Sequence, residues 1–364
     1  MDDFLKKWLI TYLWNKRKLI WFIESNIEKI IKEDKTLDKD NLIIFDWFAG
    51  SWVVSRMLKK YAKKLYVNDY ENYSFIINSC YLPDRSNELQ KEIEFYINKA
   101  NEIKLKWNWW FIYEKYAPKN DNNIKNGERV FFTSYNAKII DNIRLFIDNE
   151  VPVHIKKYIL WELIQKASIH NNTSGVFKWF HKKNWIWHFW WSWENALTRI
   201  KWEITLEYPI YYNTWTNVVI LQWDTNKKIN EIEEKLDITY YDPPYNQHPY
   251  WSNYGILNII ANNGWEIQED WVSWIPKNWY KSEWNKKQES IIALDNLVKN
   301  TNSKYIIFSY NNEWIIPINK FKEILEKYWK VEMVEQKYNA YRWSRNLKWR
   351  DTHVNELLWI LKKN

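Results

Sequence analysis

The chain has 364 residues, which suits one large α/β domain with an insertion or two domains. Its 53 lysines and arginines against 45 aspartates and glutamates give a formal charge of +8, which agrees with a polyanionic partner without identifying one. The single cysteine, Cys80, excludes an internal disulfide framework. Without an apolar run of about 18 residues or a signal-type N-terminus, we expect a cytoplasmic protein with no membrane partner.

The tryptophan and glycine contents are both abnormal, at 29 and 5 residues. Glycine normally makes up about 7% of a chain, and turns with positive φ favour it. Several tryptophans stand where turns are expected: Trp52, Trp185, Trp187, Trp190, Trp191 and Trp193. We interpret most of the tryptophans as glycines of the natural protein, as would follow if UGA codons for glycine were translated as tryptophan. A naturally tryptophan-rich protein is the alternative.

The N-terminal segment carries a short motif followed by a helix. The motif is Tyr12-Leu13-Trp14-Asn15-Lys16-Arg17-Lys18-Leu19. Apolar residues then recur with helical spacing up to Ile31. Taken alone, Lys16 fits the solvated, basic start of a helix.

A strand, a turn and a helix follow in the order that cradles a nucleotide. Residues 41–46 have the composition of a buried strand ending in Asp46, and a helix is expected from about Val53 to Tyr61. The turn between them is Trp47-Phe48-Ala49-Gly50-Ser51-Trp52. Such a turn lets the backbone approach a ligand, and the helix N-terminus offers free N–H groups.

A second strand is expected over residues 64–69. An acidic residue at the end of this strand commonly binds the ribose hydroxyls of a nucleotide cofactor. Asp69 is the candidate, with Glu71 behind it. An Asp69 that caps the next helix is the alternative.

From about Pro83 to Thr216 the chain forms an insertion with helices expected over 88–101, 135–148 and 155–168. The segment from His170 to Asn195 is rich in lysine and histidine and, with glycine for tryptophan, forms a flexible loop. Lys178 and His181 are candidates to contact a phosphate backbone or base edges. The histidine spacing matches no metal pattern, so no metal is expected.

The second half of the sheet begins with a strand over 217–224 that ends in Asp224, and a helix is expected over 226–235. A strand from Leu236 then runs into Tyr240-Tyr241-Asp242-Pro243-Pro244-Tyr245. The two prolines offer no N–H and must end the strand. They hold Asp242 and Tyr245 on a stiff turn, which suits a flat, hydrogen-bonding substrate such as a nucleobase. An ordinary proline turn is the alternative.

The C-terminal part predicts a helix over 287–298 and a buried strand over 304–309. The last segments, 338–346 and 350–358, include Arg342 and Arg345.

The motifs Asp-Pro-Pro-Tyr at 242–245, Phe-Ala-Gly-Ser-Trp at 48–52 and Tyr-Leu-Trp-Asn-Lys at 12–16 resemble those of the adenine-N6 DNA methyltransferases that use S-adenosylmethionine. The resemblance extends over nearly the whole chain and is weakest over 85–130. The departures are almost all tryptophans where the family has glycine, at Trp14, Trp52, Trp179 and Trp343 among others.

The resemblance implies an α/β fold with a Rossmann-like methyltransferase sheet and an inserted, mainly helical and loop target-recognition region. Residues 1–84 and 216–364 would form the methyltransferase core, and residues 85–215 the insertion. It implies catalysis by Asp242, Pro243, Pro244 and Tyr245. The implied cofactor-binding residues are Tyr12, Lys16, Asp46, Phe48, Ala49, Gly50, Trp52, Asp69 and Asp224. The implied terminal β-hairpin makes Arg342 and Arg345 candidate phosphate contacts, with ordinary surface arginines as the alternative.

The expected activity is methyl transfer from S-adenosylmethionine to the N6 amine of an adenine flipped out of a specific double-stranded DNA sequence. A restriction-modification or epigenetic setting, a cognate restriction endonuclease and association with the nucleoid are expected as well. An RNA or protein-glutamine methyltransferase and a catalytically inactive DNA-binding or regulatory relative are the alternatives.

Overall fold

The structure is a computed structural model. It describes residues 4–5, 7, 9–10, 16–50, 52–103, 105–173, 177, 181–189, 194–244, 250–262, 282–311, 315–339 and 353–363. The chain divides into two compact units. The helical unit comprises residues 1–15, 71–213 and 250–279, and the sheet unit comprises residues 16–70, 214–249 and 280–364.

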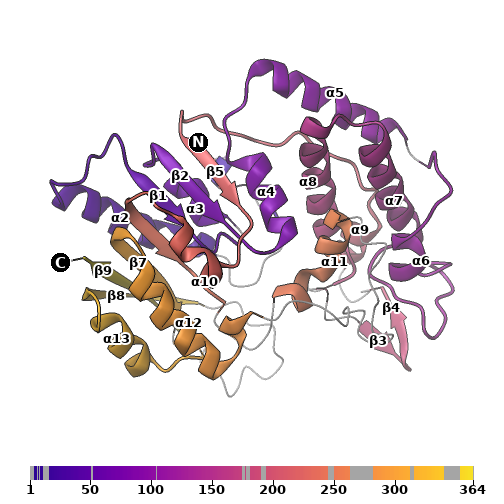
Figure 1. Ribbon diagram of the computed structural model, residues 1–364. Helices are drawn as coiled ribbons and strands as arrows, with labels where there is room; N and C mark the ends of the chain where they lie inside the picture. Colours follow the sequence, from indigo (N-terminus) through magenta and orange to yellow (C-terminus); the bar gives the residue numbers. More distant parts are fainter. Residues whose placement is uncertain are drawn as a thin grey trace. The chain divides into compact units, whose positions relative to one another are not determined.

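The sheet unit is built on one seven-stranded sheet in the order β5-β2-β1-β6-β7-β9-β8 (Figure 1). Its strands are β1 (Ile43–Asp46), β2 (Lys64–Asn68), β5 (Asn217–Leu221), β6 (Leu236–Tyr241), β7 (Ser303–Asn311), β8 (Lys330–Asn339) and β9 (His353–Lys362). The first five strands in this order pair in parallel, and β9 is antiparallel to both β7 and β8. The α/β fold class and the terminal hairpin predicted from the sequence are confirmed, although the tip of the hairpin lies outside the described residues.

Helices cover both faces of this sheet. The longer ones are α2 (Ile20–Glu33), α3 (Val53–Leu58), α12 (Lys287–Asn300) and α13 (Ile318–Glu326). Short turns are η1 (Lys16–Lys18), α10 (Thr225–Lys228), η2 (Ile229–Glu231) and η3 (Glu283–Asn285). Because side chains alternate along a strand, Phe45, Tyr241 and Phe308 share one face and form a core with α12 and α13. The helix expected over 226–235 is wrong in length, since α10 and η2 end at Glu231.

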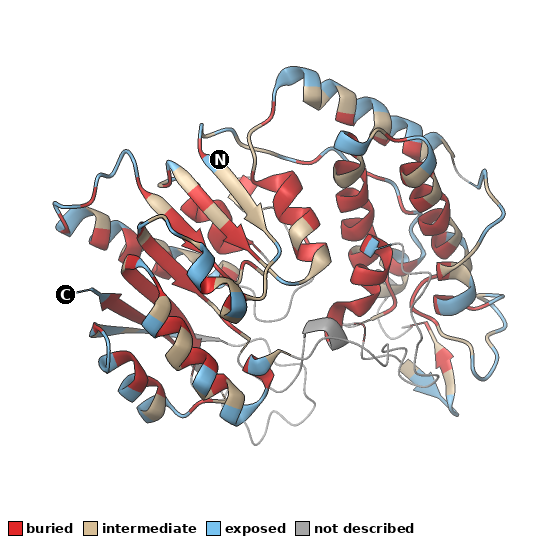
Figure 2. Cartoon of the chain, in the orientation of Figure 1, coloured by how far each residue is buried: buried red, intermediate tan, exposed pale blue. Residues whose placement is uncertain are grey.

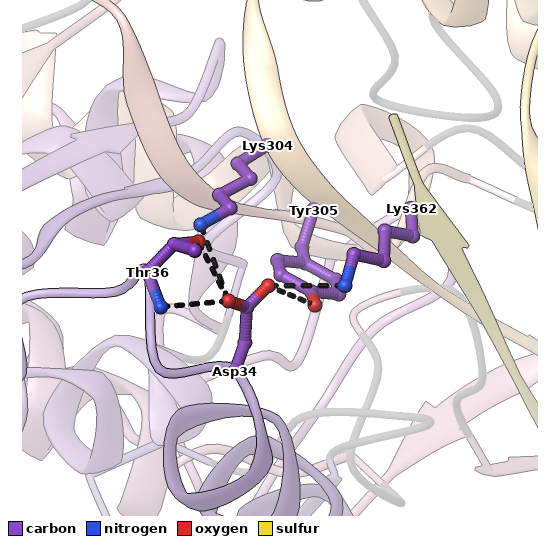
Figure 3. Close-up of polar contacts among 5 residues, drawn as sticks. All are labelled: Asp34, Thr36, Lys304, Tyr305 and Lys362. Carbon is purple, nitrogen blue, oxygen red and sulfur yellow. Dashed lines mark hydrogen bonds and ion pairs between the residues drawn. The ribbon is translucent and has the colours of Figure 1, made fainter. Parts of the chain in front are cut away.

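The end of α2 is tied to the sheet through Asp34 (Figure 3). Its carboxylate accepts hydrogen bonds from the Thr36 backbone N–H at 2.9 Å and from the Tyr305 hydroxyl at 2.6 Å. Lys304 and Lys362 lie within 3.4 and 3.1 Å of it. The Thr36 hydroxyl also donates to Oδ1, at 2.6 Å, and this hydrogen bond is the largest cause that holds the pKa of Asp34 well below its usual range, followed by that from Tyr305. Asp34 therefore fixes the helix to β7 and β9 as a charged acceptor.

The helical unit packs around α8 (Val153–Ile169), whose inner residues are buried (Figure 2). The other helices are α4 (Asn72–Tyr81), α5 (Asn87–Ile103), α6 (Ile112–Tyr116), α7 (Ser134–Asn149), α9 (Glu194–Lys201) and α11 (Tyr250–Asn262). A two-stranded hairpin joins β3 (His181–Lys183) to β4 (Ile186–His188). The three helices expected in the insertion are confirmed as α5, α7 and α8. No helix in the described part of the chain is long and apolar enough to cross a membrane.

Left-handed backbone coincides with tryptophan. Among the described residues, the non-glycine positions with positive φ are Trp52 (48°), Asn184 (51°), Trp185 (67°) and Trp215 (63°). Asn184 and Trp185 form the two-residue turn of the β3–β4 hairpin, where a type I′ turn needs positive φ twice and favours Asn-Gly. Backbone of this kind supports the interpretation of these tryptophans as glycine positions.

Candidate active site at the carboxyl ends of the strands

The sheet reverses its strand order between β1 and β6, and ligands of open α/β sheets bind at such a point, beyond the carboxyl ends of the strands. Asp46 ends β1, and Asp242 follows the last residue of β6. The Trp47 N–H donates to the Tyr240 carbonyl at 3.2 Å, which joins the two ends. The sheet therefore brings two predicted site residues together although they are distant in sequence.

The turn after β1 has the shape expected of a ligand-cradling loop. Gly50 has φ of 45°, and Trp52, at the N-cap of α3, has φ of 48° and ψ of 15°. These are the two positions where the resembling family has glycine. Trp52 is nonetheless 1% exposed, so its indole lies inside the sheet unit at the start of α3.

Asp69 holds this loop from the neighbouring strand. The Gly50 N–H donates to Asp69 Oδ2 at 2.7 Å, and the Ala49 N–H donates to the Asn68 carbonyl at 3.0 Å. The alternative that Asp69 caps the next helix is wrong, because α4 starts at Asn72 with Glu71 in the N-cap position. Asp69 thus holds the backbone of the loop that follows β1.

Asn68 is a residue of this edge that sequence reasoning missed. Its side-chain amide donates to the carbonyls of Trp47 at 3.0 Å and Trp223 at 3.2 Å, and its Oδ1 accepts from the Trp223 N–H at 2.8 Å. It joins the segments that follow β1, β2 and β5. A buried asparagine at the end of an apolar strand was the available signal, because such a group needs several partners.

Asp224 and Phe48 lie at the same edge of the sheet. Asp224 follows β5 and pairs with Lys227 at 3.0 Å, one turn ahead in α10. The ring of Phe48 contacts those of Tyr241 and Trp284, at centroid distances of 6.2 and 5.7 Å. Apart from Lys16, the predicted cofactor-binding residues that the structure describes therefore gather at the carboxyl ends of β1, β2 and β5.

Asp46 is fully buried and accepts a hydrogen bond from the Ser55 hydroxyl of α3 at 2.5 Å. The pKa of Asp46 is raised to about 7, mainly by burial; the Ser55 hydrogen bond opposes this rise, and the nearby charges of Asp242 and Asp69 contribute to it. Asp46 therefore combines a strongly raised pKa with two neighbouring acids, and such a combination is typical of functional sites.

Asp242 lies against Lys16 of η1. The Lys16 ammonium is 3.2 Å from Asp242 Oδ1 and 2.7 Å from Glu356 Oε1 of β9. The Lys16 and Glu356 side chains are 6% and 0% exposed, so this is an interior ion-pair cluster. Burial raises the pKa of Asp242 to about 7; Lys16 opposes that shift, and Glu356 adds to it.

Glu356 is a second residue that sequence reasoning missed. Its Oε1 also accepts from the hydroxyl of Ser309 on β7, while Oε2 is buried without a hydrogen-bond partner among the described residues. A glutamate inside the apolar run of a terminal strand was the available signal, since charged residues are rarely buried without a partner.

Several predicted site residues are not described. Tyr12, Tyr245, Lys178, Arg342 and Arg345 lie outside the described residues. Pro243 and Pro244 continue from β6 as predicted, with Pro243 buried. His181 begins β3 in the helical unit. The described residues hold no group of three or more side chains suited to a metal ion.

Sequence comparison gives consistent relatives. A family model described as "D12 class N6 adenine-specific DNA methyltransferase" matches residues 12–270. The Type II methyltransferase M.NlaIII of Neisseria lactamica is 26% identical over 372 residues, covering 97% of this chain and 99% of the relative. The Type II methyltransferase M.CviAII of Paramecium bursaria Chlorella virus 1 is 28% identical over 339 residues, covering 92% and 93%. The Modification methylase StsI of Streptococcus sanguinis is 27% identical over 365 residues, covering 97% of this chain but 52% of the relative.

Proposed function

The chain belongs to the D12 class of N6 adenine-specific DNA methyltransferases, and we propose that its reaction takes place between Asp242 and the loop that follows β1. As a member of this class it is an enzyme that transfers a methyl group to adenine in DNA. The RNA methyltransferase and the inactive relative are not favoured by these matches. The observation that carries the location is the meeting of Asp46 and Asp242 at the reversal of strand order.

The chemistry follows from the nitrogen that is methylated. The lone pair of an exocyclic adenine amine is conjugated with the ring, so the amine is a poor nucleophile. Asp242 accepts one N–H of the amine, and the carbonyl of Pro243 accepts the other. These bonds favour a pyramidal nitrogen with its lone pair free, and they stabilise the positive charge that develops there. Tyr245 stacks on the flipped adenine.

S-Adenosylmethionine is the methyl donor that the residues of this edge suit. Asp69 and Asp224 place carboxylates at the ends of β2 and β5, where ribose hydroxyls and an adenine amine need acceptors. When bound, the cofactor supplies an electrophilic methyl group. Lys16 and Tyr12 would lie at its methionine end.

The target-recognition region is assigned to residues 85–215. Its β3–β4 hairpin carries His181 and the exposed residues Lys182 and Lys183 next to the exposed Trp185. Basic and polar side chains on a narrow hairpin suit contacts to phosphates and base edges. The relatives named as type II methyltransferases further support a role in restriction-modification, with a cognate endonuclease as partner and a place beside the nucleoid in the cytoplasm.

The test is mass-spectrometric analysis of nucleosides from duplex DNA incubated with S-adenosylmethionine and the full chain. The expected product is N6-methyladenine, absent when the cofactor is left out. A parallel incubation with single-stranded RNA separates the alternative substrate. Methylation of RNA with unmodified DNA would contradict the proposal.

A further inference from the structure

The carboxylate of Glu356 is a buried charged group beside the proposed site that the reaction above leaves without a task. It lies on β9, near the C-terminal end of the chain, and is fully buried. Burying a charge costs desolvation energy, and a buried ion pair often stabilises a fold less than apolar residues of the same size would. A role in stability alone therefore explains Glu356 poorly.

The direction of its contacts suggests what Glu356 does. Strand alternation places Asp46, Tyr240, Asp242, Ser309 and Glu356 on the same face of the sheet, because their paired neighbours in β1, β6, β7 and β9 share that parity. All five lie toward the carboxyl ends of β1, β6 and β7. Glu356 thus lies on the same face of the sheet as Asp242, the proposed catalytic carboxylate, and is separated from it by a single residue that contacts both.

Lys16 connects the two acids. Its ammonium lies 2.7 Å from Glu356 Oε1 and 3.2 Å from Asp242 Oδ1, and Ser309 donates to the same Oε1. Asp242 Oδ1 is buried, whereas the Asp242 side chain as a whole is 16% exposed. The oxygen that faces Lys16 is therefore the one shielded from solvent, and Oδ2 remains to meet a substrate.

We propose that Glu356, with Ser309, is a positioning residue for methyl transfer: it fixes Lys16 on Asp242 Oδ1, so that Asp242 presents Oδ2 to the target amine. This inference rests on the proposed role of Asp242. Without the anchor, Lys16 keeps Asp242 as its carboxylate partner but is no longer held at Oδ1, so its ammonium can move to Oδ2, the oxygen that the target amine needs. Two ion pairs, Glu356–Lys16 and Lys16–Asp242, thus hold the Asp242 carboxylate in one orientation.

The charges around Asp242 also set the pH range in which its carboxylate is ionised and can accept a hydrogen bond. Lys16 from η1 and Glu356 from β9 act on the pKa of Asp242, and Asp242 in turn raises the pKa of Asp46 on β1 and of Tyr240 on β6. Glu356 disfavours the ionised form of Asp242 and Lys16 favours it. Replacing Glu356 by a neutral group removes one like charge, so the pKa of Asp242 should fall.

The test compares pH profiles of single-turnover methylation for a parent with glycine at positions 14 and 52 and for Glu356→Gln, Glu356→Asp and Glu335→Gln made in the same parent. For Glu356→Gln we expect the rate at high pH to fall about tenfold, the equivalent of removing one interaction of ordinary strength. Its midpoint should move down by about half a pH unit or more, as expected when a nearby like charge is removed. Glu356→Asp keeps the charge, so its midpoint should stay near that of the parent.

Glu335 is the matched control because it lies on β8, one residue from the register partner of Glu356, and is exposed. Glu335→Gln should behave as the parent does. A lower rate with an unmoved midpoint in Glu356→Gln would indicate a merely structural residue and overturn the proposal.

A second measurement does not depend on catalysis. Carbon-13 NMR of protein labelled at the aspartate carboxyl carbons follows the titration of Asp242, assigned by the disappearance of its signal in Asp242→Asn. The proposal predicts a lower midpoint for this signal in Glu356→Gln, and an unchanged midpoint would contradict it. If the parent methylates no DNA, the proposed function fails, while this titration still decides the link between Glu356 and Asp242.

Discussion

Replacing Trp52 with glycine tests how the loop after β1 receives its cofactor. Left-handed backbone costs an L-residue about 1–2 kcal/mol, which glycine does not incur. Trp52 is at φ 48° and is 1% exposed, so the substitution relieves this strain and also removes a buried indole. Removal of a large buried aromatic side chain costs about 3–5 kcal/mol. The cofactor-free protein should therefore lose about 1–4 kcal/mol of unfolding free energy.

Cofactor affinity should change in the opposite direction. In the resembling family the second glycine of this loop allows the backbone to approach the ligand with no Cβ between them. If the indole fills this space or strains the loop at a cost of about 3–4 kcal/mol, the binding of S-adenosylmethionine weakens several hundredfold. Trp52→Gly, and more so its combination with Trp14→Gly, should therefore bind S-adenosylmethionine more tightly than the chain as it stands.

Calorimetric titration measures the affinity, and thermal unfolding with and without S-adenosylmethionine measures the linked stabilisation. Trp185→Gly is the matched control, since Trp185 has φ of 67° and is 82% exposed. It should stabilise the protein by about 1 kcal/mol by relieving its backbone and leave cofactor affinity unchanged. Tight binding by the chain as it stands, weakened by Trp52→Gly, would refute the reasoning and identify the tryptophan as native.

Three further predictions concern charge. Asp34→Asn should cost about 1–3 kcal/mol of unfolding free energy at pH 7, measured with urea, because it removes a buried charged acceptor. Because the pKa of Asp34 is lowered in the folded state, its contribution to the unfolding free energy is present above the ordinary aspartate pKa and is lost as pH falls through the lowered value. A difference in unfolding free energy between the parent and Asp34→Asn that persists at low pH would contradict this. Methylation by the parent should rise through about pH 7, where Asp242 ionises, and a rate independent of pH from 6 to 8 would contradict the role of its raised pKa. DNA affinity should fall steeply with salt, and alanine at Lys178, Arg342 and Arg345 should reduce the log–log slope by about 0.9 for each phosphate that the protein no longer neutralises, whereas an unchanged slope would place the DNA elsewhere.

The order of motifs along the sequence is enough to predict the centre of the site. A strand ending in Asp46 and another ending before Asp242 suffice to place both at the carboxyl edge of a parallel sheet, because strands and their crossovers follow few topologies. The parallel core also explains why apolar runs such as that of β1 were recognisable. The helices of the insertion were predicted to within one or two residues because their apolar spacing is regular.

Contacts that depend on the register of the strands could not be predicted from the sequence. Lys16 and Glu356 are 340 positions apart, and their pairing depends on β9 inserting beside β7 with Glu356 opposite Asn311. Asn68 was missed for a similar reason, since the partners of its side chain include backbone groups of two different segments, at Trp47 and Trp223. No local pattern encodes either arrangement. The helix after β5 was overestimated because its polar residues allow several lengths and propensity alone is a weak guide.

The most direct test of the account is single-turnover methylation of adenine-containing duplex DNA by Asp242→Ala, made with glycine at positions 14 and 52 in both variant and parent. Asp40→Ala is the control, because Asp40 is exposed and precedes the amino end of β1, at the other end of that strand from Asp46. The account predicts that Asp242→Ala abolishes methyl transfer while binding of S-adenosylmethionine stays within a few-fold of the parent. Methylation by Asp242→Ala within a few-fold of the parent would contradict the assignment of Asp242 as the group that acts on the target amine.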